Sequence, residues 1–168
     1  VVQLELNGEG RLAYRVLRDG KPVLADSRLG FVFRNGRQLL RGLQLEKQAT
    51  RSSDSTWEQP WGERRFVRDH FVEKDHDQRR FDMVFRVFDD GVGFRYDVPA
   101  QPKLAEAQVV QELTEFAIAR PATAWWIPAF EWNREEYLYH RTPLDAVAVA
   151  QTPITLRTDD GDTHTRPR

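Results

Sequence analysis

The sequence predicts an all-β fold, an antiparallel β-sandwich with little helix. Five turn dipeptides recur along the 168 residues, and most of them separate runs rich in Val, Leu, Phe and Thr. They are Asn7-Gly8, Asp19-Gly20, Asn35-Gly36, Asp90-Gly91 and Asp160-Gly161. No segment carries a long apolar stripe with the 3.6-residue period of a helix. Many short antiparallel strands joined by Gly-containing turns favour a sandwich or barrel over an α/β fold.

The first third of the chain is typical of consecutive hairpins. Leu12, Tyr14 and Val16 alternate with polar neighbours just before Asp19-Gly20. The run 31–33 (Phe-Val-Phe) precedes Asn35-Gly36 in the same way. Each register is therefore expected to be set locally by its turn.

A central hairpin is predicted around Asp90-Gly91, with these residues at the two turn positions. The predicted apolar face pairs Val87 with Phe94 and Phe85 with Tyr96. On the other face Arg86 lies opposite Arg95. Facing like charges destabilise a sheet by roughly 0.2–1 kcal/mol, so the prediction requires an anionic partner between them.

Glu112 and Glu115 are the candidates for that partner, as a structural ion pair with Arg86 and Arg95. The alternative is a pair of acid–base carboxylates for glycoside cleavage. On one regular strand, however, Glu112 and Glu115 face opposite sides, since their positions differ by an odd number. The ion-pair role is therefore preferred.

The other expected strands are Phe66 to Val72, Phe81 to Phe88, Val92 to Val98, Val109 to Ile118 and Ala146 to Ala150. Two stretches are expected to be long connections, Arg51 to Gly62 and Pro121 to Arg134, and together they contain all five tryptophans. A tryptophan can stack on a sugar ring and bond a hydroxyl, or it can bury its area in packing or in a domain interface. Both readings stay open for these candidates: Trp57, Trp61, Glu63, Trp125 and Trp126.

Composition and motifs exclude several classes of function. Lys and Arg total 25 against 26 Asp and Glu, which disfavours nucleic acid as a partner. There is no cysteine, no apolar run long enough for a membrane span and no composition break that would divide residues 1–168 into two domains. The four histidines lack metal-site spacing, and neither a Gly-x-Ser-x-Gly elbow nor a phosphate loop is present. No catalytic residue and no metal ligand is nominated in this chain.

An ordered set of phrases resembles one known family. The phrases are Ser27-Arg28-Leu29-Gly30, Asp54-Ser55-Thr56-Trp57, Pro60-Trp61-Gly62-Glu63, residues 85–91, Phe94-Arg95-Tyr96, residues 112–116 and residues 152–161. Together they resemble the N-terminal domain of glycoside hydrolase family 97, bacterial α-glucosidases and α-galactosidases.

The resemblance implies a β super-sandwich like that of galactose mutarotase. In the complete enzyme a catalytic (β/α)8 barrel and a small β domain would follow, and we expect residues 1–168 to be the N-terminal part without the barrel. The family's N-terminal domain is thought to lend one Glu to calcium just after the Thr-Pro-x-Thr segment. Residues 162–168 contain no Glu, so calcium is expected only in the complete enzyme. The resemblance also implies export, to the periplasm or outside the cell.

The leading hypothesis is a noncatalytic N-terminal domain that packs on the barrel and shapes its active site for α-linked oligosaccharides. The alternative is a free-standing carbohydrate-binding module, which rests on the tryptophans alone. A mutarotase-like epimerase ranks last, because it rests on fold analogy and no His and Glu acid–base pair is nominated.

Overall fold

The computed structural model describes residues 1–34, 38–45, 49, 52–58, 66–72, 81–101, 108–130, 137–159 and 163–166. Two compact units divide the chain, Val1–Ala117 and Ile118–Arg168. Each unit has its own cluster of buried apolar side chains. The expectation of one domain over residues 1–168 stays a prediction.

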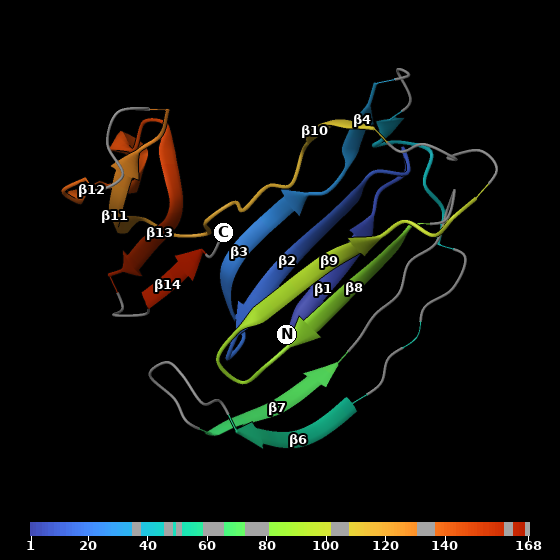
Figure 1. Ribbon diagram of the computed structural model, residues 1–168, viewed down its shortest axis with the longest axis horizontal. Coiled ribbons are helices and arrows are strands. Elements are labelled where there is room, and N and C mark those ends of the chain that lie inside the picture. Colours follow the sequence, from blue (N-terminus) through green and yellow to red (C-terminus); the bar gives the residue numbers. More distant parts are fainter. Residues whose placement is uncertain are drawn as a thin grey trace. The chain divides into compact units, whose positions relative to one another are not determined.

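The first unit is built from short antiparallel strands, and in the three-stranded sheet β1-β2-β3 the strands lie side by side (Figure 1). A second sheet has the order β10-β4-β5, and β6-β7 and β8-β9 are two-stranded. The strands are β1 (Val2–Leu6), β2 (Leu12–Arg18), β3 (Lys21–Arg28), β4 (Phe31–Phe33), β5 (Gln38–Leu39), β6 (Ser52–Glu58), β7 (Phe66–Val72), β8 (Asp82–Val87), β9 (Val92–Asp97) and β10 (Val109–Glu112). The expected all-β class is confirmed.

The turn between β2 and β3 confirms the first predicted hairpin. Asp19 has φ 49° and Gly20 has φ 75°, and the pair Arg18↔Lys21 closes the turn. Two positive φ angles in a two-residue loop match the right-handed twist of the flanking strands. The dipeptide Asp-Gly therefore sets this register, as expected.

The register predicted for the β8–β9 hairpin is wrong by two residues. Phe85 pairs with Phe94 and Val87 with Val92, and the Phe88 amide donates to the Gly91 carbonyl at 2.8 Å. Arg86 therefore lies opposite Gly93 rather than Arg95. The last pair is Val87↔Val92, so the loop is longer than two residues. In this register the Phe85 and Phe94 rings pack at a centroid distance of 5.2 Å. A shift of two keeps each side chain on its predicted face.

Tyr14 occupies the centre of the first unit's core and is 1% exposed. Its ring centroid lies 5.8 Å from that of Phe85 and 5.4 Å from that of Phe94. A third ring, Phe116, meets it edge-on at 6.3 Å. These contacts pack the β1-β2-β3 sheet against the β8-β9 pair, as in a sandwich.

The chain after β10 runs along β3 rather than forming the long strand expected from Val109 to Ile118. Regular strand geometry ends at Glu112. Beyond it, the Leu113 amide donates to the Gly30 carbonyl and the Glu115 amide to the Arg28 carbonyl, both at 2.9 Å. These hydrogen bonds hold the segment beside β3 and provide partners for its backbone amides.

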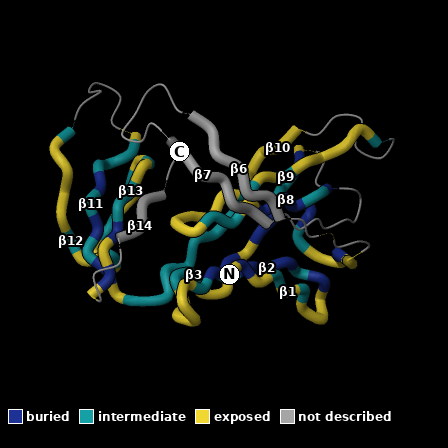
Figure 2. The backbone as a smooth tube through the Cα atoms, turned by 90° about the horizontal axis from the view of Figure 1, so that it is seen from below, coloured by how far each residue is buried: buried dark blue, intermediate teal, exposed yellow. Residues whose placement is uncertain are grey.

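The second unit is a four-stranded antiparallel sheet of order β12-β11-β13-β14. Its elements are β11 (Ala122–Pro128), β12 (His140–Pro143), the 3-10 helix η2 (Leu144–Ala146), β13 (Ala150–Thr158) and β14 (Thr163–Arg166). Ala122, Ala124 and Trp126 alternate inward from β11 and pack with Leu156. Figure 2 shows β11 as buried and half-buried, whereas β12 is largely exposed.

Three sequence expectations about these elements are wrong. Residues 122–128 form β11, because Ala122, Ala124 and Trp126 bury one face with strand periodicity even though prolines flank the run. Residues 52–58 form β6, because their backbone pairs with β7 from Ser52↔Val72 to Glu58↔Phe66. Residues 146–150 span the end of η2 and the start of β13 rather than a strand of their own.

Two glycines with the same backbone conformation should respond differently to a methyl group. Gly10 has φ +68°, and a Cβ there would lie 2.6 Å from the Leu43 amide nitrogen. Gly20 has φ +75° and open space around it. We expect Gly20→Ala to cost about 1–2 kcal/mol from backbone strain alone. Gly10→Ala should cost about 1–3 kcal/mol more, because a backbone contact must shift.

Urea unfolding of the two variants measures this difference as a change in midpoint at constant slope. Equal midpoints for Gly10→Ala and Gly20→Ala would contradict the close approach of residues 10 and 43.

Candidate functional site

Trp125 and Trp126 are neighbours on β11 and therefore point to opposite faces of the second unit's sheet. Trp126 is 7% exposed and belongs to the core. Its indole Nε1 donates to Thr142 Oγ1 at 3.0 Å, and its ring stacks on His140 at a centroid distance of 5.0 Å. Buried indoles usually find such a partner, so the geometry gives Trp126 a packing role.

Trp125 lies on the other face, half-buried between two arginines. The guanidinium carbons of Arg141 and Arg157 are each 5.5 Å from its ring centroid. These residues belong to β12 and β13, which flank β11 on opposite sides, so they approach the ring from opposite sides. Each contact at an exposed site is worth about 0.5–1 kcal/mol. Two protein cations therefore lie close to the ring on which a sugar would stack.

The remaining tryptophan-loop candidates stay predictions. Trp57 lies in β6, and its backbone pairs with that of Val67 in β7. Trp61 and Glu63 lie outside the described residues. The described part of the chain therefore leaves their ligand-facing role untested.

Two of the charged residues predicted to form a clamp, Arg95 and Glu115, have other described partners. Arg95 Nη2 contacts Asp97 Oδ2 at 3.0 Å, along the same strand. Glu115 pairs with Arg28 at the end of β3 instead of with Arg86 or Arg95. Glu115 differs from its predicted pairing because residues 113–117 run beside β3, which carries the Glu115 carboxylate to Arg28.

Both oxygens of the Glu115 carboxylate accept hydrogen bonds from Arg28. Oε2 accepts from the Arg28 amide at 3.1 Å, and Oε1 accepts from Nε at 2.8 Å and from Nη2. Hydrogen bonding to the Arg28 side chain lowers the pKa of Glu115, against a smaller opposing effect of desolvation. Charge-assisted hydrogen bonds of this kind, two to Oε1 from the guanidinium and one to Oε2 from the backbone amide, orient both groups. Glu115 is thereby engaged as a structural anion rather than as a free acid–base group.

Glu112 ends a short polar relay that reaches the core. The Thr114 hydroxyl donates to Glu112 Oε1 at 2.6 Å, so the Tyr96 hydroxyl, 2.8 Å from Thr114 Oγ1, must donate to it. Burial is the main cause that raises the pKa of Tyr96 to about 12. Tyr96 therefore remains a neutral hydrogen-bond donor at physiological pH.

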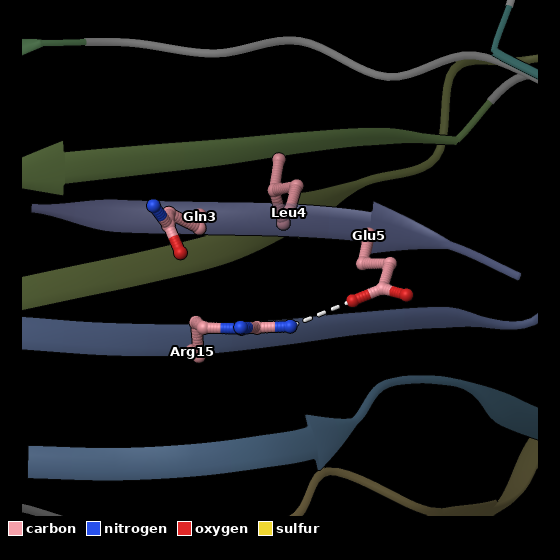
Figure 3. Close-up of a pocket in the computed structure, with 4 residues that line it drawn as sticks. All are labelled: Gln3, Leu4, Glu5 and Arg15. Atoms are coloured by element: carbon pink, nitrogen blue, oxygen red, sulfur yellow. Dashed lines mark hydrogen bonds and ion pairs between the residues drawn. The ribbon is translucent and has the colours of Figure 1, made fainter. Parts of the chain in front are cut away.

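A shallow open depression of about 380 Å³ lies on the β1–β2 surface (Figure 3). Its lining is Gln3, Leu4, Glu5 and Arg15. Arg15 Nη2 contacts Glu5 Oε2 at 2.8 Å, and its Nε contacts Asp26 Oδ1 at 2.9 Å. Because two carboxylates already bind this guanidinium, Arg15 has little capacity left to bind an anionic ligand.

Two kinds of feature are absent from the described residues. They contain no group of three or more His, Cys, Asp or Glu that could hold a metal ion. Nor do they contain a helix long and apolar enough to cross a membrane.

The arginines beside Trp125 and the partner of Glu115 were missed by sequence reasoning. Arg141 and Arg157 are far from Trp125 in sequence, and only the order β12-β11-β13 brings them together. The alternation of Ala122, Ala124 and Trp126 was the signal that could have identified β11 and hence the outward face of Trp125.

Comparisons with known proteins agree on one family. Residues 1–165 match the family model described as Glycosyl-hydrolase 97 N-terminal. A probable retaining alpha-galactosidase of Streptomyces bingchenggensis (strain BCW-1) is 33% identical over 139 residues, which are 80% of this chain and 21% of that protein. The predicted family resemblance is confirmed.

Solved structures give the same result. Two structures of a Glycoside Hydrolase Family 97 enzyme from Pseudoalteromonas sp. strain K8, in complex with panose and with acarbose, are both 37% identical, with TM-scores of 0.84 and 0.85. In each comparison, 96% of this chain and 26% of the other chain are covered. A beta-arabinopyranosidase, 23% identical with a TM-score of 0.78, shares the fold. The chain thus spans about a quarter of the solved enzymes it matches.

The Arg28–Glu115 pair predicts an acid-sensitive part of stability. Because the folded pKa of Glu115 lies below its ordinary value of 4.5, the stabilisation is fully present above that value. It is lost as the pH falls through the folded pKa. The urea midpoint of Glu115→Gln should therefore be below that of the wild type near neutral pH, and the gap should close in acid.

Glu9→Gln is the matched control, because it neutralises a carboxylate that pairs with Arg11 at the surface. A gap between wild type and Glu115→Gln that stays constant with pH, or that Glu9→Gln reproduces in full, would contradict the role of Glu115.

Proposed function

The chain belongs to the glycosyl-hydrolase 97 N-terminal family, and from that membership we propose that it packs on the catalytic barrel of a longer α-glycosidase and shapes its active site. The observation that carries the proposal is how much of a family 97 enzyme this chain represents. The family match covers residues 1–165, whereas the chain spans only 26% of the solved family 97 enzymes. A noncatalytic domain fits this share of a larger enzyme.

The hydrogen bonds of Glu112, Glu115 and Tyr96 favour a structural role for these side chains over a catalytic one. Glu115 is engaged by Arg28 and Glu112 by Thr114. Tyr96 is held as a neutral donor by burial. Each of these groups is engaged by other groups of the protein, whereas an acid–base catalyst must reach its substrate. Substrate positioning is the contribution that such a domain makes to the rate.

We propose an α-linked oligosaccharide as the substrate of the longer enzyme. The support is the relatives: one is described as a probable retaining alpha-galactosidase, and another is solved with panose and with acarbose. Calcium is proposed for the longer polypeptide, with no ligand assigned among the described residues of this chain. Export to the periplasm or the cell exterior is proposed on the family resemblance.

A free-standing carbohydrate-binding module is the second candidate, and it rests on Trp57 and Trp61. Trp125 and Trp126 do not favour it, because Trp126 is buried and Trp125 lies between two arginines. Sugar-binding modules need an accessible aromatic face.

Activity and binding measurements on two proteins test the proposal. The purified 168-residue chain should hydrolyse neither a chromogenic α-glucoside nor an α-galactoside, and panose should give no heat of binding in calorimetry. The longer polypeptide should be active, and deletion of residues 1–168 should lower kcat/KM by about tenfold or more, as lost positioning does.

Hydrolysis by the isolated chain would contradict the noncatalytic role. Panose binding that disappears in Trp57→Ala or Trp61→Ala, but not in Val98→Ala, would support the binding module instead. Full activity after the deletion would contradict any contribution of the domain to the active site.

A further inference from the structure

Four large apolar side chains at one end of the second unit's sheet are strongly exposed. They are Phe130 at 78%, Leu138 at 91%, Tyr139 at 58% and Val149 at 61%. We refer to these four residues as the apolar end. Such side chains scattered singly over a surface need no explanation, but a gathered set marks an interaction site.

Strand register brings the apolar end together. Trp126 pairs with His140 and Pro128 pairs with Ala150, so β11 finishes where β12 and β13 begin. Phe130 follows β11, Leu138 and Tyr139 precede β12, and Val149 precedes β13. The Ala129 amide donates to the Val149 carbonyl at 3.0 Å, which fixes Val149 beside the residue that precedes Phe130. Segments that are distant in sequence thus meet at one sheet end.

Phe130 has a strained backbone conformation, and its exposed side chain gains little packing energy to offset that strain. Its φ is 65°, a left-handed conformation that a bulky side chain rarely adopts. Holding a non-glycine residue there costs roughly 1–3 kcal/mol, and such residues persist where the surroundings or a function require them. A ring that is 78% exposed gains little from the described chain. Its use therefore lies in another contact.

The described residues at the apolar end are uncharged, whereas the segment that links Phe130 to Tyr137 contains four charged residues, Glu131, Arg134, Glu135 and Glu136. The described residues around it, 129–130, 137–139 and 147–150, contain no Asp, Glu, Lys or Arg, although these types make up 30% of the whole chain. Depletion of charge together with enrichment in aromatic side chains is typical of the buried centre of a protein interface. Sugars, in contrast, are recognised by polar groups around an aromatic platform.

We propose that the apolar end is the surface on which the rest of the longer polypeptide docks. This inference rests on the proposed function, and it adds the place of contact. The occupant follows from extent, because about three quarters of each solved family 97 chain lies outside the part matched by these residues, which cover 26%. A neighbour within the same polypeptide is always present, so a permanently exposed apolar surface would be covered as the protein folds.

Phe130→Asn with Leu138→Asn is the informative double variant. Asparagine tolerates the left-handed conformation at position 130 and removes the apolar area at both positions. The matched control is Val98→Asn with Val109→Asn, two valines exposed by 38% and 49% in the first unit. In the isolated 168-residue chain, the double variant should keep the wild-type urea midpoint.

In the longer polypeptide the double variant should loosen the docked domain. Limited proteolysis between residues 1–168 and the rest should become at least about tenfold faster, since aromatic anchors dominate interface energies. The control pair should leave the cleavage rate unchanged.

Other outcomes overturn the inference. A large loss of stability in the isolated chain would mean that this chain itself covers the apolar end. Dimerisation of the isolated wild-type chain that the double variant abolishes would make a second copy the occupant. If deletion of residues 1–168 lowers activity but the double variant is cleaved like the control, the docking surface is wrong while the proposed function survives.

Discussion

The hydrogen bond from the Tyr14 hydroxyl is the interaction that holds the parts of the first unit together. It donates to the Glu115 carbonyl at 2.8 Å, while the ring is 1% exposed and touches Phe85 and Phe94 from the facing layer. One side chain therefore joins a sheet, the layer packed on it and the chain segment that follows β10. Packing against the other aromatic rings buries Tyr14, and a buried hydroxyl without a hydrogen bond would cost free energy. The Arg28–Glu115 pair and the Glu112–Thr114–Tyr96 relay lie on the same segment and depend on its position.

These constraints explain why the residues that suggested chemistry serve architecture instead. The carboxylates of residues 112 and 115 are committed to polar partners, and Trp126 and Trp125 are committed to a core and to two arginines, respectively. What the second unit leaves uncommitted is apolar surface at one end of its sheet. The proposed supporting role is consistent with this combination of a satisfied interior and an exposed apolar surface.

Local signals in the sequence predicted much of the fold, and nonlocal ones did not. Asp19-Gly20 sets its hairpin because the required positive φ angles are encoded in those two residues. Asp90-Gly91 predicted a hairpin with the correct faces but the wrong register, because ring packing between Phe85 and Phe94 decided the loop length. The partners of Glu115 and Trp125 depend on which strands become neighbours, and a single sequence does not contain that information. Family membership came from ordered phrases, which record ancestry rather than physics.

Hydrogen exchange on the isolated 168-residue chain tests the Tyr14 linkage most directly. The amides of Leu113 and Glu115 donate to β3 and its end, and in the wild type they should exchange as slowly as amides in the core strands. In Tyr14→Phe both should exchange about tenfold faster, since a lost hydrogen bond is worth about 0.5–1.5 kcal/mol. The amides of β13 in the second unit, with its separate core, should not change. Unchanged exchange at Leu113 and Glu115 in Tyr14→Phe would contradict the account.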